Sequence, residues 1–128
     1  MNLNWYQTLI KPSLTPPSIV FPIAWGILYF LIFLSFLFYI RKIKNLKDFF
    51  PLSLFFSGLI LNFLWTPVFF KIHDMKLALA IIVLIILLLI PNIILFYKKD
   101  KLSGILLIPY LIWLLFAFYL NYQFIKLN

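Results

Sequence analysis

The stretch at residues 77–97, LALAIIVLIILLLIPNIILFY, runs for 21 residues without a charged side chain. A helix rises 1.5 Å per residue, so this stretch is long enough to cross the roughly 30 Å hydrocarbon core of a bilayer. Residues 18–40, 49–70 and 102–125 form three more uncharged stretches of similar length. All four are continuously apolar rather than alternating, which favours helices over the strands of a membrane barrel. We therefore predict one all-α domain, an integral membrane bundle of four transmembrane helices.

The composition excludes most classes of soluble protein. Hydrophobic residues make up 66% of the chain and charged residues 11%, against about 45–50% and 25% in soluble proteins. The chain has no cysteine, which excludes disulfides, thiolate metal sites and cysteine nucleophiles. The net charge of +8 does not indicate a nucleic-acid partner, because the charged residues lie between the apolar stretches or at the chain ends. The lipid bilayer is the first partner that we expect.

Lysine and arginine counts predict how the bundle is oriented. The connections after the first and third stretches hold seven basic residues and share one face, whereas the other face holds Lys11, Lys71, Lys76 and Lys126. By the positive-inside rule the seven-residue face lies in the cytoplasm, and both termini lie outside a membrane such as the inner membrane of a bacterium. Residues 1–17, which include Trp5 and three prolines, are expected to form an interfacial segment.

Few catalytic groups are available inside the membrane. The four stretches contain no Asp, Glu, Lys, Arg or His, which argues against a proton-coupled transporter because such proteins need an intramembrane carboxylate. The single histidine, His73, lies between the second and third stretches, where we expect a solvated loop residue rather than a metal ligand. Three glycines cannot supply a dinucleotide-binding loop. No metal or required cofactor is expected.

Aromatic and amide side chains remain, and helical spacing groups them. Trp25 and Tyr29 are one turn apart, and Asn62, Trp65 and Phe69 share another face. A third stripe contains Pro109, Trp113, Ala117 and Asn121. Singly, such residues join helices or face lipid; together, rigid rings with a few hydrogen-bonding groups and no charge predict a pocket for a flat, largely apolar ligand. Interruptions of the helices are expected at Pro22, Pro67, Pro91 and Pro109.

Four blocks of sequence carry a family resemblance. They are WYxxLxKPSxTPP at residues 5–17, FPIAWxxLY at 21–29, LNxxWxxxFF at 61–70 and PYxxWxxFA at 109–117, followed by LN at 120–121 and a terminal Asn128. In this order they resemble the tryptophan-rich sensory protein (translocator protein) family over essentially the whole chain. The family fold has five helices, and its Trp-Tyr…Lys-Pro motif follows the first. Since the motif begins here at Trp5, the family's first helix is missing from this sequence. Either the protein is a four-helix variant of the family, or the start of the sequence was placed late.

The resemblance implies a membrane receptor for tetrapyrroles, porphyrin or haem, with a sensory, transport or regulatory role and commonly a homodimeric state. The expected ligand contacts are Tyr6, Trp25, Tyr29, Asn62, Trp65, Trp113, Ala117 and Asn121. The resemblance implies Tyr6, Trp25, Asn62 and Trp113, and the helical stripes add the other four. The propionates of a porphyrin are expected near Lys11, Lys71 and Lys76, because a buried unpaired carboxylate costs several kcal/mol.

Two alternative functions stay open at this stage. One is a light- and oxygen-dependent enzyme that degrades porphyrin, for which the resemblance implies Trp25 and Trp113 as the reacting residues. The other is a binder of sterols or other hydrophobic ligands, because Leu120, Tyr122 and Lys126 fit a pattern proposed for sterol contact. That pattern is weak, and three other places in this chain also match it. An interfacial anchor is therefore the main expectation for Tyr122 and Lys126.

Overall fold

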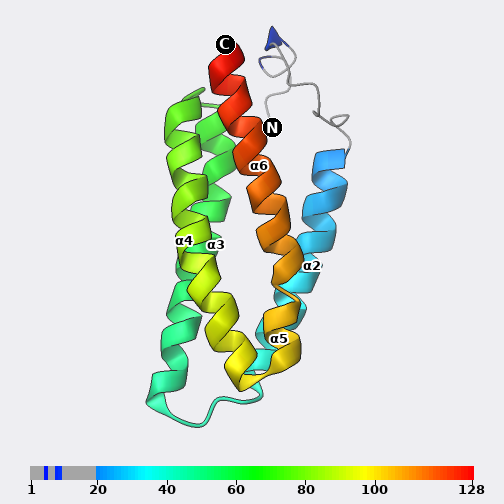
Figure 1. The fold of residues 1–128 in the computed structure, drawn as a ribbon, viewed down its shortest axis with the longest axis vertical. Helices are drawn as coiled ribbons and strands as arrows, with labels where there is room; N and C mark the ends of the chain where they lie inside the picture. The colour runs from blue at the N-terminus through cyan, green and yellow to red at the C-terminus, as the bar shows by residue number, and fades with distance from the viewer. Residues whose placement is uncertain (1–4, 6–7, 10–19) are drawn as a thin grey trace.

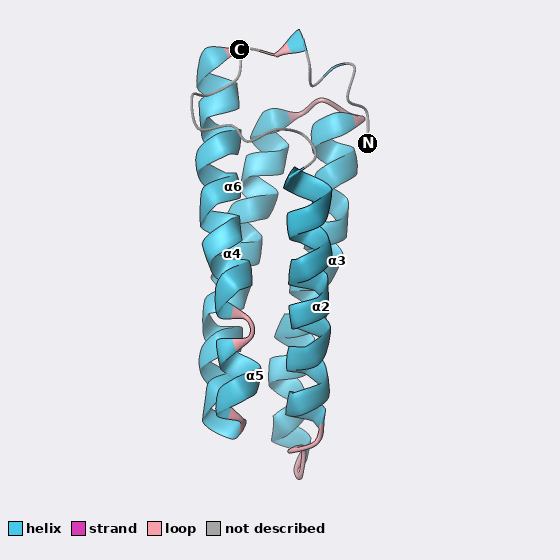
Figure 2. Cartoon of the chain, turned by 90° about the vertical axis from the view of Figure 1, so that its right-hand side faces the viewer, coloured by secondary structure: helices cyan, strands magenta, loops and turns pink. Residues whose placement is uncertain are grey.

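The computed structural model describes Trp5, Thr8, Leu9 and residues 20–128. Its elements there are α2 (Val20–Ile40), the short 3-10 turn η1 (Leu46–Asp48), α3 (Phe49–Phe70), α4 (Met75–Lys99), α5 (Lys101–Ile105) and α6 (Ile108–Leu127). Every element in this described part is a helix (Figure 2). Four helical segments of the described part are each long and apolar enough to cross a membrane. They are α2, α3, α4, and α5 together with α6. The predicted all-α membrane bundle with four spans is confirmed.

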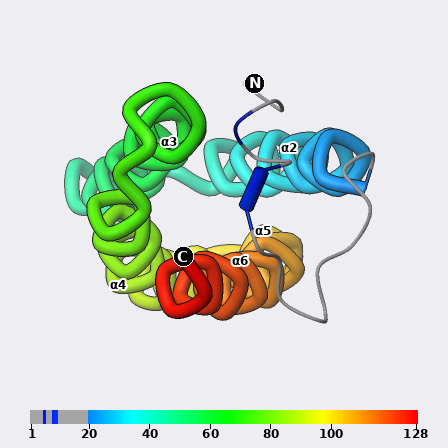
Figure 3. Tube along the Cα trace, turned by 90° about the horizontal axis from the view of Figure 1, so that it is seen from above, coloured from blue at the N-terminus to red at the C-terminus, as the bar shows by residue number. Residues whose placement is uncertain are grey.

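Short connections make successive spans antiparallel (Figure 1). Viewed along the bundle, α4 lies between α3 and α6, and α2 stands on the opposite side (Figure 3). Capping side chains begin two of the helices: Asp74 accepts a hydrogen bond from the Leu77 N–H at the start of α4, and Asp100 accepts one from the Ser103 N–H at the start of α5. Such caps satisfy N–H groups that the first helical turn leaves unpaired.

Only one of the four prolines coincides with a break inside a span. Pro67 and Pro91 lie within continuous stretches of α3 and α4, and Pro22 lies in the first turn of α2. The fourth span is divided at residues 106–107, two positions before Pro109. Proline lacks an N–H and its ring crowds the carbonyl four positions earlier, here in Ile105, the last residue of α5. The expectation of four interruptions was therefore wrong at three prolines, whose environments tolerate them as membrane helices commonly do.

The buried face of each span follows helical periodicity. In α2 the buried residues are Leu28, Ile32, Ser35 and Tyr39, spaced three or four positions apart as expected for one helix face. The outward faces of the spans carry large exposed apolar side chains, including Phe30 and Phe33 of α2. In water such faces would drive aggregation, so they indicate an apolar surrounding such as a membrane provides.

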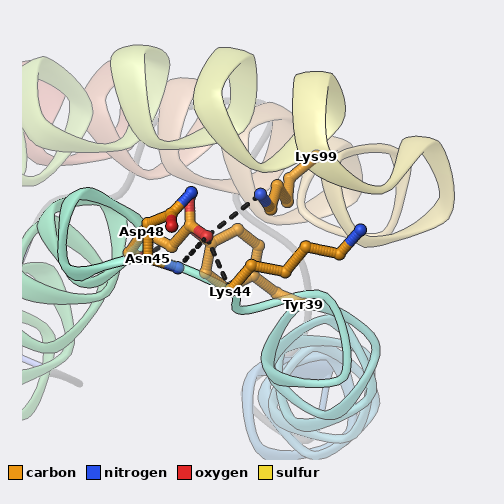
Figure 4. Close-up of polar contacts among 5 residues, drawn as sticks. All are labelled: Tyr39, Lys44, Asn45, Asp48 and Lys99. Carbon is orange, nitrogen blue, oxygen red and sulfur yellow. Dashed lines mark hydrogen bonds and ion pairs between the residues drawn. The ribbon is translucent and has the colours of Figure 1, made fainter.

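An ion pair fastens the α2–α3 connection to the end of α4 (Figure 4). The Asp48 carboxylate lies 3.0 Å from the Lys99 ammonium and accepts hydrogen bonds from the backbone N–H groups of Lys44 and Asn45. The Tyr39 hydroxyl donates to the backbone carbonyl of Asp48 at 2.6 Å. These contacts join the C-terminal ends of α2 and α4 to the start of α3, so the two connections on this side of the bundle form one surface.

Candidate ligand-binding cavity

A cavity of about 220 Å³ lies between the spans, near the first turn of α2 and the C-terminal ends of α3 and α6. Aromatic and amide side chains from α2, α3 and α6 form most of its wall, and α4 adds two isoleucines. The lining residues are Phe21, Pro22, Trp25, Tyr29, Asn62, Trp65, Thr66, Phe69, Phe70, Ile82, Ile85, Trp113, Leu114, Ala117, Leu120, Asn121 and Phe124. Among the lining residues that the structure describes there is no carboxylate, ammonium, guanidinium or imidazole group.

Two tryptophans from different spans meet on the wall of the cavity. The rings of Trp25 in α2 and Trp113 in α6 are 6.2 Å apart between centroids and nearly perpendicular, at 83°. Tyr29 stacks on Trp25 at 5.5 Å, and Phe21 meets Trp113 edge-on at 6.0 Å. Such edge-to-face pairs add about 0.5–1.5 kcal/mol to the stabilisation from burial. The α2–α6 side of the cavity is therefore a continuous set of aromatic rings.

The buried amide of Asn62 joins three spans. The Tyr29 hydroxyl of α2 donates to the Asn62 side-chain oxygen, and the Asn62 amide donates to the Tyr110 hydroxyl of α6 at 3.0 Å. Interhelical hydrogen bonds in membranes are worth about 0.6–2 kcal/mol each. This series of hydrogen bonds holds α2, α3 and α6 in register beside the tryptophan pair.

A second amide, Asn121, makes the corresponding link nearer the end of the bundle. Its side-chain oxygen accepts a hydrogen bond from the Trp65 indole at 3.1 Å, and its amide donates to the Met75 carbonyl at 2.9 Å. Trp65 also stacks on Phe69 one turn later in α3. The Trp65 indole is thus held in place by α6, and it presents a fixed aromatic surface to the cavity.

Trp5 lies beside this end of the cavity. Its ring meets Phe69, a lining residue, edge-on at 5.4 Å, and stacks on His73 at 4.1 Å with 9° between the planes. His73 is exposed in the connection between α3 and α4, as predicted, and has a left-handed backbone with φ of 61°. Within the described residues, no group of three His, Cys, Asp or Glu side chains is placed to hold a metal ion.

The structure brings most of the predicted contact residues together. The cavity is lined by Trp25, Tyr29, Asn62, Trp65, Trp113, Ala117 and Asn121. Tyr6 and Lys11 lie outside the described residues, as does most of the interfacial segment expected at 1–17. Lys71 and Lys76 are exposed at the corner between α3 and α4, at the same end of the bundle as the cavity.

The residues of the sterol pattern do not share one surface. Leu120 lines the cavity, whereas Tyr122 and Lys126 are exposed on the outside of α6. Residues two positions apart in a helix point in nearly opposite directions, because each residue turns the helix by about 100°. Tyr122 and Lys126 are four positions apart and lie on one outward face, a placement that suits an interfacial anchor.

Sequence reasoning missed several lining residues. The sequence could have indicated Phe21 and Phe124. Each lies about one helical turn from a predicted contact, Trp25 and Asn121 respectively. The sequence carries no comparable signal for Ile82 and Ile85, since the helix around them is aliphatic on every side. Which side of such a helix faces the cavity is decided only by packing.

Comparisons with known proteins agree with the fold and with the aromatic cavity. The model of the TspO/MBR family matches residues 1–127. This chain belongs to the TspO/MBR family. It is 38% identical over 126 residues to the tryptophan-rich sensory protein of Cereibacter sphaeroides, an alignment that covers 98% of this chain and 77% of that protein.

Similar relatives occur in archaea and in mammals. The tryptophan-rich protein TspO of Archaeoglobus fulgidus is 38% identical over 98% of this chain and 80% of its own length. The human translocator protein is 34% identical over 94% of this chain and 72% of its own length. The family resemblance predicted from the four sequence blocks is therefore confirmed, and the described part of this TspO/MBR member contains four candidate spans.

Proposed function

We propose that this TspO/MBR member is a membrane receptor that binds a tetrapyrrole, porphyrin or haem, in the cavity between its spans. The observation that carries the proposal is the perpendicular pair of Trp25 and Trp113 on the wall of a cavity whose described lining has no charged side chain. A flat apolar macrocycle gains most of its binding energy from stacking and from leaving water. The described lining offers both, together with amides that are already hydrogen-bonded to the protein.

The size of the cavity supports a partly inserted ligand. Its volume of about 220 Å³ is below the roughly 300–1,000 Å³ of sites that enclose drug-sized ligands. A macrocycle that enters edge-on would therefore keep one edge outside. Propionates on that edge would remain in water near Lys71 and Lys76, which avoids the cost of burying an unpaired carboxylate.

Tryptophan fluorescence in detergent solution tests this proposal. Protoporphyrin added to the purified protein should quench the emission with saturation, because Trp25, Trp65 and Trp113 line the cavity. The Phe33→Leu variant, altered on the exposed face of α2, is the matched control and should bind as the wild type does. Quenching that rises linearly with porphyrin concentration and does not saturate would show that the cavity does not bind the macrocycle. Equal quenching by a non-planar anionic detergent would show the same.

A second candidate function, light-dependent degradation of porphyrin, uses the same tryptophans. It is favoured by the contact between Trp25 and Trp113, because a ligand against one indole would lie near both. Illumination of the porphyrin-loaded protein in air and under nitrogen separates the candidates. Degradation by the protein requires dioxygen and yields a new pigment spectrum faster than illumination of free porphyrin in the same detergent. A receptor leaves the porphyrin unchanged under nitrogen and gives no acceleration over free porphyrin in air.

The homodimer that the family resemblance implies is also proposed rather than established. Closed two-fold pairing is the commonest symmetric assembly, and the exposed aromatic faces of the spans offer apolar surface for it. Mass measurement in nanodiscs should give two chains per particle. Particles that contain one chain and still bind porphyrin would refute the dimer and would show that the receptor function does not require it.

A sterol that displaces the bound porphyrin would indicate the alternative ligand class.

A further inference from the structure

The end of the bundle opposite the cavity carries a dense positive charge. Its cations are Arg41, Lys42, Lys44, Lys47, Lys98, Lys99 and Lys101. The carboxylates there are Asp48 and Asp100, which leaves a net charge of +5 (seven cations against two carboxylates). The contacts around Asp48 hold the two connections together (Figure 4), so these charges form one surface, which we term the basic end.

Both carboxylates of the basic end are already engaged within the protein. Asp48 is buried and pairs with Lys99, the only ion pair among the residues that the structure describes. Asp100 caps α5 by accepting the Ser103 N–H at 3.2 Å. The Lys44 side chain extends away from Asp48 although its backbone N–H is bound there (Figure 4). Exposed positive charge is therefore left at Arg41, Lys42, Lys44, Lys47, Lys98 and Lys101.

Exposed apolar side chains stand among these cations. Leu46, between Asn45 and Lys47, is 89% exposed. Phe49 and Phe50, in the first turn of α3, are 52% and 60% exposed. The bundle leaves more than half of each of these three side chains exposed, so apolar surface remains for a contact from outside. Positive charge next to unburied Leu and Phe is the pattern of a surface that sits at the boundary between headgroups and acyl chains.

We propose that the basic end binds anionic phospholipids, with Lys42, Lys44 and Lys47 on the headgroup phosphates and Leu46 against the acyl chains. Clusters of four to eight basic residues next to a membrane span attract anionic lipids, with about 1 kcal/mol for each cation near the surface. A soluble phosphate or polyanion would neutralise the lysines but would leave Leu46 in water. The juxtaposition of charge and apolar surface therefore favours a lipid over a soluble anion.

Native mass spectrometry of the detergent-solubilised full chain tests this proposal with phosphatidylglycerol and phosphatidylcholine as probes. The wild type should retain phosphatidylglycerol about ten-fold or more tightly than phosphatidylcholine, and added salt should reduce the preference. The K42Q/K44Q/K47Q variant should lose most of it. The matched control, K71Q/K76Q/K126Q, removes the same number of charges from the opposite end and should lose much less of the preference than K42Q/K44Q/K47Q does.

Further measurements distinguish a lipid headgroup from a soluble phosphate as the ligand of the basic end. Inorganic phosphate and glycerol 3-phosphate should compete weakly, and Leu46→Gln should lower phosphatidylglycerol retention while all lysines remain. Equal retention of the two lipids by the wild type, equal loss in both triple variants, or full displacement by the soluble phosphates would each overturn the proposal. Circular dichroism checks folding, and if the triple variant is unfolded, the single variant K47Q and the salt dependence of the wild type decide the outcome.

Discussion

The indole rings of Trp25 and Trp113, 88 positions apart in the chain, meet edge to face with 6.2 Å between their centroids. The two rings come from α2 and α6, two spans that both line the cavity. Phe21 and Tyr29 extend the same aromatic surface to either side. The pair therefore links the packing of two spans to the wall of the cavity, and replacing it tests structure and function at once.

The double variant Trp25→Phe/Trp113→Phe should lose any photodegradation of porphyrin but keep measurable binding. Phenylalanine preserves most of the apolar stacking surface and removes only the indole, which is the more easily oxidised ring. Absorbance under illumination reports degradation, and quenching of the two remaining tryptophans, Trp5 and Trp65, reports binding. Persistent degradation in this variant would exclude both indoles as the reacting groups.

Charge at the cavity end should contribute little compared with stacking. Lys71→Gln together with Lys76→Gln should weaken porphyrin binding modestly, because each exposed pair with a propionate is worth about 0–1 kcal/mol. The salt dependence of binding should fall in parallel. Lys98→Gln with Lys101→Gln, at the far end of the bundle, is the matched control. Normal binding and unchanged salt dependence in the first variant would show that the propionates lie elsewhere.

Gly104→Ala should destabilise the bundle. A Cβ at this position would lie 2.6 Å from the Tyr97 Cβ and 2.7 Å from its Cα, so backbone as well as side chain must move. Overpacking of this kind costs about 1–3 kcal/mol. Gly58→Ala is the control, because nothing lies within 4 Å of its added Cβ and alanine favours a helix by roughly 0.5–1 kcal/mol. In detergent, the midpoint temperature of thermal unfolding should therefore be equal to or above that of the wild type for Gly58→Ala and well below it for Gly104→Ala.

Asn121→Leu should lower stability and loosen the Trp65 side chain. The change removes the acceptor of the Trp65 indole and the donor to the Met75 carbonyl, at a cost of about 1–2 kcal/mol. Gln123→Leu, two positions later on a half-buried face of α6, is the matched control. Unfolding curves measure stability, and fluorescence anisotropy of Trp65, with the other tryptophans replaced by phenylalanine, measures its mobility. Equal effects of the two substitutions would contradict a specific role for Asn121.

Reporter fusions should place the C-terminus outside the cytoplasm. The seven cations at the basic end outnumber those at the opposite end, and the positive-inside rule keeps the richer face in the cytoplasm. A fusion after Asn128 should therefore be active with a periplasmic reporter in a bacterial inner membrane. A fusion within the 41–45 connection should be active with a cytoplasmic reporter. The reverse pattern would overturn the orientation.

The sequence by itself determined the four spans, the family and the residues that share one face of a single helix. Uncharged runs such as 77–97 can satisfy their backbone in a bilayer only as helices, and the i, i+4 spacing of Trp25 with Tyr29 is a local property of such a helix. For this reason the predicted contacts in α2, α3 and α6 were found on the cavity wall.

Only the tertiary structure decided how these faces meet. The contact of Trp25 with Trp113, the bond between Trp65 and Asn121 and the pairing of Asp48 with Lys99 depend on how the spans rotate and cross, which side-chain packing between helices sets. The part played by Ile82 and Ile85 was hidden because α4 is aliphatic on every side over residues 77–90. Likewise Pro109 breaks its span while Pro67 and Pro91 do not. A uniformly apolar helix carries no local pattern that tells lipid from cavity, so the packing of its neighbours alone supplies that distinction.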